Sequence, residues 1–200
     1  MTARVSVAVS HGAAVRSYGE DLAYPSASIV KVSILAALLL EGRELTERER
    51  ALARDMIVRS DNDAATELWT TIGGAPGLDA AHARLGLTRT RARRAWGLTR
   101  TTARDQLALL RAVFDGPYPY LRTLMGQVVA GQDWGVSAAG GPWALKNGWM
   151  PMRESGLWVV HSVGRAGGSL IAVLSEGHPT KEAGIACVEA AARAAVTTRA

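Results

Sequence analysis

Three short motifs hold most of the residues in this chain that can do chemistry. They are Ser28-Ile29-Val30-Lys31, of the form S-x-x-K, Ser60-Asp61-Asn62, which is S-D-N, and Lys146-Asn147-Gly148, a variant of K-T-G. In this order such motifs supply a nucleophilic serine, a lysine base, a hydroxyl that relays protons and a cationic wall. The sequence therefore predicts an enzyme that forms a covalent acyl intermediate on Ser28.

The spacing of the first motif suits a serine that is activated by a lysine. Ser28 and Lys31 are three positions apart, so at the start of a helix both side chains lie on one face and the amine can reach the hydroxyl. Burial, the charge of Lys146 and the positive end of the helix are each expected to lower the pKa of Lys31, so that it can act as a base. The turn over residues 24–27 places the Ser28 N–H where it can donate to a developing oxyanion.

The second motif is predicted to move a proton and to hold the substrate. Ser60 and Asn62 can face the site together, while Asp61 points away and binds the backbone amides of its own loop. Ser60 then passes a proton to the leaving group, with Lys146 as its support, and Asn62 binds a substrate amide.

The third motif fits the start of a strand that lines the far wall of the site. Gly148 leaves room for a substrate alongside the strand, and the Trp149 N–H is the expected second oxyanion donor. The Trp149 ring is expected to pack or to line the substrate groove. Each motif also has a plain structural interpretation, as a helix cap, a snorkelling lysine or a turn. Their occurrence together and in order favours the catalytic interpretation.

The elements that must position these motifs are predicted from changes in period along the chain. Strands are expected at both ends, over Arg4–Ser10, Ala13–Tyr18, Trp143–Trp149, Leu157–Val163 and Ser169–Ser175, and a helix over Thr180–Val196 closes the chain. Helices are expected between them, over Ser28–Leu40, Thr46–Met56, Leu78–Leu85, Thr102–Phe114 and Leu121–Gly131, and one more from at or just after Ser60-Asp61-Asn62 through Trp69. We therefore predict one domain of α+β type, with a five-stranded antiparallel sheet formed by both termini (about 1–25 and 140–200) and an inserted all-helical lobe (about 26–139).

With these three motifs in this order, the chain resembles the serine β-lactamase and penicillin-binding protein superfamily, most closely the class A β-lactamases. The residues that follow Ser60, Asp61-Asn62-Asp63-Ala64-Ala65, and the segment Thr101-Thr102-Ala103-Arg104-Asp105 also resemble that family. The resemblance implies Ser28 as nucleophile, Lys31 as base, Ser60 and Lys146 as relay and support, and Asn62 as a substrate anchor.

Two departures from the family pattern affect the expected activity. Asn147 stands where the family has Thr or Ser, so an amide replaces a hydroxyl that helps to hold a substrate carboxylate. Class A enzymes also carry a glutamate, ahead of the Thr-Thr segment, that activates the deacylating water, whereas residues 80–104 of this chain contain arginines and no Asp or Glu. An arginine cannot accept a proton from water, so we predict a poor β-lactamase. The arginines are expected to be solvated or to bind an anionic substrate group.

Composition limits the other function classes. A net charge of +5 is compatible with an acidic partner, but no basic face with aromatics and no recognised module indicates nucleic acid. No apolar run is long enough to cross a membrane, no ligand spacing implies a metal or cofactor, and the single Cys187 cannot form an internal disulfide. His161 is expected to be a satisfied core histidine or to lie near the site.

The sequence thus predicts a serine hydrolase that acts on a small-molecule or peptide substrate. A D,D-peptidase or transpeptidase and a binding module without activity remain alternatives. No export signal is visible, which predicts a cytoplasmic protein unless the true start lies upstream.

Overall fold

An antiparallel sheet forms the frame of the molecule in the computed structural model, which describes residues 2–40 and 42–197. Its strands, in the spatial order β2-β1-β7-β6-β5, are β1 (Arg4–His11), β2 (Ala14–Tyr18), β5 (Trp143–Pro151), β6 (Trp158–Ala166) and β7 (Ser169–His178). Because β1 pairs with β7, the first and last strands lie side by side. The predicted five-stranded sheet built from both ends of the chain is therefore confirmed, with β5 at one edge.

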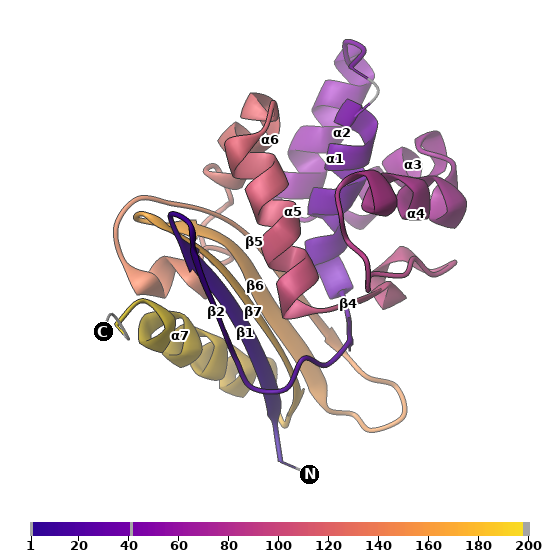
Figure 1. Cartoon of the computed structure of the whole chain (residues 1–200). Coiled ribbons are helices and arrows are strands. Elements are labelled where there is room, and N and C mark those ends of the chain that lie inside the picture. The colour runs from indigo at the N-terminus through magenta and orange to yellow at the C-terminus, as the bar shows by residue number, and fades with distance from the viewer. Residues whose placement is uncertain (1, 41, 198–200) are drawn as a thin grey trace.

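Side chains of the sheet alternate between two cores. On β7, Ile171 and Val173 pack in the core that includes residues of α7 (Lys181–Thr197), whereas Ala172 and Leu174 belong to the core of the other helices. Figure 1 shows α7 on one face of the sheet and the remaining helices, α5 nearest, on the opposite face. The same two-residue period decides which residues of β5 can face the helices.

The helical part follows β2 in the sequence and precedes β5. Its helices are α1 (Val30–Leu40), α2 (Glu47–Val58), α3 (Asn62–Thr71), α4 (Gly74–Arg84), α5 (Ala103–Asp115) and α6 (Pro119–Met125), with 3-10 turns η1 (Ala27–Ile29), η2 (Trp96–Leu98) and η3 (Val136–Ala139). α1 is buried from Val30 to Leu38, as its apolar run predicts. Within the described residues, no helix has the length and hydropathy needed to cross a membrane.

Helix starts with a side-chain cap lie where the sequence places them. Thr46 and Glu49 form a capping box at the start of α2, and Asp61 caps α3 by accepting a hydrogen bond from the Ala64 N–H at 2.7 Å. The glycine-rich segment after α3, residues 73–77, contains the first turn of α4, which begins at Gly74 and so earlier than the predicted start at Leu78. A Cβ at Gly77 would lie 1.6 Å from the carbonyl oxygen of Ile72, so glycine permits this tight junction.

A short ribbon interrupts the region that was expected to be all helical. β3 (Tyr24–Pro25) pairs with β4 (Arg100–Thr101), Tyr24 opposite Thr101 and Pro25 opposite Arg100. Two-residue strands have too little pattern to be predicted. The ribbon joins the segment just before Ser28 to the loop just before α5, and so it brings that loop to the predicted site.

Candidate active site

Ser28 lies in η1, at the point where the helical part meets the sheet. Every residue from Tyr24 to Leu38 is buried except Ser28, which is partly exposed. The predicted start of a regular helix at Ser28 is wrong, because the serine occupies a 3-10 turn and α1 begins two residues later.

Strained backbone flanks the nucleophile candidate. Ala27 has a φ of 46°, in the left-handed region that residues with a Cβ seldom adopt. Ser60, with a φ of 60°, is the other non-glycine residue of positive φ in the described ranges 2–40 and 42–197. Strain of this kind is concentrated at functional sites, and here it falls at or beside two of the three motifs.

The S-D-N motif holds the amine of Lys31, whose side chain is fully buried. Lys31 Nζ donates to Ser60 O at 2.7 Å, to Ser60 Oγ at 3.3 Å and to Asn62 Oδ1 at 2.8 Å. No hydrogen bond joins Ser28 to Lys31 in the described part of the chain, so the reach of the amine to the Ser28 hydroxyl stays a prediction from their spacing.

Lys146 on β5 meets Lys31 at the Ser60 hydroxyl. Its Nζ donates to Ser60 Oγ at 2.9 Å and to the carbonyl oxygen of Asn147 at 2.9 Å, and its side chain is also fully buried. A serine oxygen accepts two hydrogen bonds. With both amines donating to it, the Ser60 hydroxyl proton is left for a third partner, as a proton relay requires.

Burial lowers the pKa of both lysines. Desolvation brings the pKa of Lys31 from 10.5 to about 8, against the opposing charge of Asp61. Desolvation and the charge of Lys31 hold the pKa of Lys146 well below its usual value. Because the pKa of each amine is lowered, less free energy is needed to remove its proton, which favours proton exchange with the Ser60 hydroxyl between them.

β5 approaches the Ser28 turn so closely that only glycine fits at position 148. A Cβ on Gly148 would lie 2.9 Å from the backbone N of Ser28, 2.9 Å from that of Ile29 and 3.1 Å from the carbonyl oxygen of Ser26. The sequence predicts room for a substrate at this glycine, and the structure shows the backbone around Ser28 as its neighbour. Gly148 thus brings the third motif to the first.

The side chains of Asn147 and Trp149 lie away from this cluster. Asn147 is buried, and its Nδ2 donates to the carbonyl oxygens of Gln132 and Trp134 at 2.8 Å each. The centroid of the Trp149 ring lies 5.8 Å from that of the Trp134 ring. Lys181 Nζ of α7 lies 4.2 Å from the Trp149 centroid. The structure therefore uses both side chains to hold the loop before η3 and α7, and it does not bring them to Ser28.

Strand alternation explains this division. Lys146 and Gly148 face Ser60 and η1, so the residues between and after them face the α7 side. The Asn147 carbonyl accepts a hydrogen bond from Lys146 Nζ at 2.9 Å, and β5 is an edge strand of the sheet. By the same two-residue period, the Trp149 N–H is expected to point out from the sheet edge, where an oxyanion donor is needed.

Comparison with known sequences gives the chain a family. A sequence profile described as the beta-lactamase enzyme family matches residues 41–196. The chain belongs to this family. The match begins after Lys31, so the second and third motifs lie within it and the first lies before it. Among curated proteins, no match was found.

Solved class A β-lactamases share the fold. The class A β-lactamase from Mycobacterium abscessus aligns with a TM-score of 0.77 at 20% identity, over 97% of this chain and 93% of that one. The putative class A β-lactamase PenP from Rhodopseudomonas palustris gives 0.76 at 21%, over 97% and 93%. A mutant of the last common ancestor of Gram-negative bacteria class A β-lactamase gives 0.77 at 22%, over 97% and 92%. The predicted superfamily and fold are confirmed.

Within this β-lactamase fold, Trp96 is the site residue that sequence reasoning missed. Lys31 Nζ lies 4.9 Å from the centroid of the Trp96 ring, and Trp96 Nε1 donates to Thr66 Oγ1 at 3.2 Å. The sequence showed that residues 80–104 contain no glutamate. It did not predict that Trp96 is the residue of this segment that approaches Lys31. A lone aromatic among arginines was the available signal.

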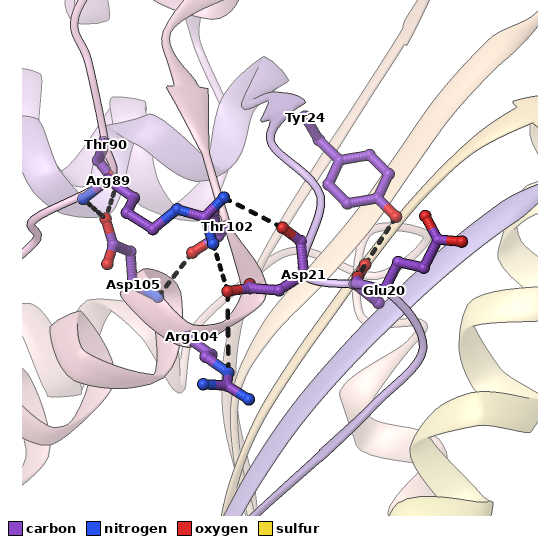
Figure 2. A network of polar contacts seen from close by, with 9 residues as sticks. Glu20, Asp21, Tyr24, Arg89, Thr90, Thr102, Arg104 and Asp105 are labelled. Carbon is purple, nitrogen blue, oxygen red and sulfur yellow. Dashed lines mark hydrogen bonds and ion pairs between the residues drawn. The ribbon is translucent and has the colours of Figure 1, made fainter.

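The arginines around Trp96 tie the loop between α4 and α5 to the rest of the protein. Figure 2 shows that the guanidinium groups of Arg89 and Arg104 both approach the Asp21 carboxylate, Arg89 as a hydrogen-bonded ion pair and Arg104 at 3.9 Å. The Asp105 carboxylate accepts from the Arg89 N–H at 2.9 Å and from the Thr90 hydroxyl at 2.6 Å. These contacts hold the first part of the loop against α5.

Backbone pairing closes the loop. Arg91 and Arg100 exchange N–H···O bonds of 2.8 and 2.9 Å, and the Ser26 N–H donates to the Thr99 carbonyl at 2.7 Å. The Arg100 side chain also binds the carbonyl oxygen of Ala23. Several of the arginines that were expected to be solvated or to bind an anion therefore bind the chain itself.

His161 is a satisfied core histidine. Its Nε2 lies 2.8 Å from the carbonyl oxygen of Pro25, and its Nδ1 accepts from the Ser175 N–H at 3.0 Å. These partners fix a neutral ring with its proton on Nε2, and burial lowers the pKa to about 4. His161 supports the segment before Ser28 and offers no group to a substrate.

Proposed function

We propose that this chain is a serine hydrolase that forms an acyl-enzyme through Ser28 on an amide, ester or β-lactam-like carbonyl. The supporting observation is the Ser60 hydroxyl, bound by the amines of Lys31 and Lys146 beside the one partly exposed residue of a buried segment. Neither amine forms an ion pair with a described residue. Burying an unpaired amine costs free energy of folding. Buried groups with strongly shifted pKa values are typical of catalytic sites.

The proposed reaction assigns a role to each group. Ser28 Oγ attacks the carbonyl carbon and gives its proton to neutral Lys31. The N–H groups of Ser28 and Trp149 stabilise the charge on the carbonyl oxygen. As the bond to the leaving group breaks, Ser60 donates its proton to that group and regains one from Lys31, directly or through Lys146. The products are an ester on Ser28 and the protonated leaving group.

Hydrolysis of that ester is expected to be slow. Residues 80–104 contain no carboxylate to activate water, and the residue of this loop that approaches Lys31 is Trp96. We therefore propose a poor β-lactamase. The same observation favours a second candidate, a penicillin-binding D,D-peptidase or transpeptidase, which needs the same acyl-enzyme and takes a peptide substrate.

Intact-mass spectrometry after incubation with benzylpenicillin tests the covalent step. We expect one penicilloyl group to be added, no addition in Ser28→Ala, and normal addition in Ser155→Ala, a control in the exposed loop between β5 and β6. Rapid, sustained hydrolysis of nitrocefin would contradict a poor β-lactamase. If no activated acyl donor modifies the wild-type protein, the acyl-enzyme is wrong and a binding module without activity is favoured.

The rate of acylation is expected to rise with pH. Only the neutral amine of Lys31 can take the Ser28 proton, and its pKa is about 8. Below that pH the neutral fraction grows about tenfold per pH unit, and above it the rate levels off. Adduct formation timed by intact mass between about pH 6 and 9.5 measures the profile. A rate that is independent of pH over this range would exclude Lys31 as the base.

A further inference from the structure

We propose that Trp96 sets the lifetime of the acyl-enzyme by keeping water from the Lys31 side of the Ser28 ester. This inference rests on the proposed function, because it concerns the intermediate that the proposed function requires. It assigns to Trp96 a positioning role, since the indole excludes solvent and takes no part in bond making.

The position of Trp96 carries the inference. Its ring centroid lies 4.9 Å from Lys31 Nζ. Lys31 itself follows Ser28 by three residues in the sequence. The Trp96 carbonyl oxygen accepts a weak hydrogen bond from Ser26 Oγ at 3.5 Å, two residues before the serine. The ring and backbone of one residue thus contact elements on both sides of Ser28, and η2 packs against η1.

The chemistry of the indole decides what this position does. Hydrolysis needs a water molecule beside the ester and a group that takes its proton. An indole N–H is a donor only, and in Trp96 it is already used by Thr66. The three hydrogen bonds that Lys31 donates go to Ser60 and Asn62, so no donor of the protonated amine is left to hold a water, and the Trp96 ring beside it offers no acceptor for one.

The loop holds the ring in place. Arg89 and Arg104 bind Asp21, and Asp105 binds the backbone and side chain at the start of the loop (Figure 2). The pairing of Arg91 with Arg100 closes its base. Because these contacts fix both ends of the loop, Trp96 is expected to stay over Lys31 when Ser28 is acylated.

The first test compares the decay of the penicilloyl adduct in three variants after free benzylpenicillin is removed. Trp96→Ala opens the Lys31 side to water and is expected to shorten the lifetime about tenfold. Trp96→Phe keeps an aromatic ring and should decay as the wild-type protein does. Leu98→Ala, an exposed position in the same turn, is the matched control and should also be unchanged.

A second pair of variants keeps the test valid if Trp96→Ala fails to fold. Trp96→Glu and Trp96→Gln are similar in size, but only the carboxylate can take a proton from water. We expect Trp96→Glu to deacylate about 100-fold faster than Trp96→Gln above the pKa of the new carboxyl, with the advantage lost at lower pH.

The outcomes separate this inference from the proposed function. Adducts that decay equally in wild-type protein, Trp96→Ala and Trp96→Glu would overturn the role of Trp96 and leave the acyl-enzyme intact. Failure of the wild-type protein to form any adduct would overturn the proposed function and this inference with it.

Discussion

Replacing Lys31 by methionine is expected to slow acylation of Ser28 by about 10³-fold, within the range typical for loss of a general base. Methionine is unbranched and apolar, so it can fill the buried site without the amine. The change ends the desolvation of a buried amine but also removes its three hydrogen bonds to Ser60 and Asn62, so these opposing effects are expected to leave only a small change in the thermal unfolding temperature. Adduct formation by intact mass and unfolding followed by circular dichroism measure the two effects on the same protein.

Lys181→Met is the control for this change. Lys181 contacts the Trp149 ring on the α7 side of the sheet, away from the Ser60 cluster, and its removal should leave acylation unchanged. Wild-type acylation in Lys31→Met would show that another group takes the Ser28 proton. Equal loss in both variants would show that the α7 side of β5 also belongs to the site.

The overall architecture was predictable because its signals are local and repeated. The alternation in residues 4–10 and the apolar run from Ile29 to Leu40 each specify one element over many residues. The capping box at Thr46 specifies a helix start through two reciprocal hydrogen bonds. Given strands at both ends of the chain and helices between them, a single sheet formed by both termini follows.

The parts that could not be predicted depend on contacts between distant segments. Ala27 and Ser60 take left-handed conformations, although neither is a residue that favours them. The β3–β4 ribbon is too short to leave a pattern, yet it delivers the loop of Trp96 to Lys31. Loop geometry of this kind is decided by pairing partners some 75 positions apart, such as Pro25 and Arg100, and not by the composition of the loop.

The candidate site shows the same limit at the level of single side chains. Ser60, Lys31 and Lys146 come together as their motifs predict. Asn147 and Trp149 were expected to bind substrate, but strand alternation turns their side chains to the other face. A motif specifies which residues are close in sequence, whereas the two-residue period of β5 specifies which of them share a face.

Gly148→Ala is expected to reduce acylation at least about 100-fold, because misplacing catalytic groups by even about 1 Å is that costly. The new Cβ would lie 2.9 Å from the backbone N atoms of Ser28 and Ile29, and neither can rotate out of the way. β5 must therefore move away from η1. This separates the two proposed oxyanion donors, the N–H groups of Ser28 and Trp149, and draws Lys146 back from Ser60.

The size of this effect can be told apart from a general loss of stability. Overpacking is expected to lower the free energy of unfolding by about 1–3 kcal/mol, and unfolding in urea measures this loss. Acylation is then measured under conditions in which the variant is fully folded. Gly97→Ala is the matched control, since a Cβ there meets no atom within 4 Å although the residue lies in the Trp96 turn. If folded Gly148→Ala acylates as fast as Gly97→Ala, the contact between β5 and the Ser28 turn serves packing, and the third motif does not help Ser28 to react.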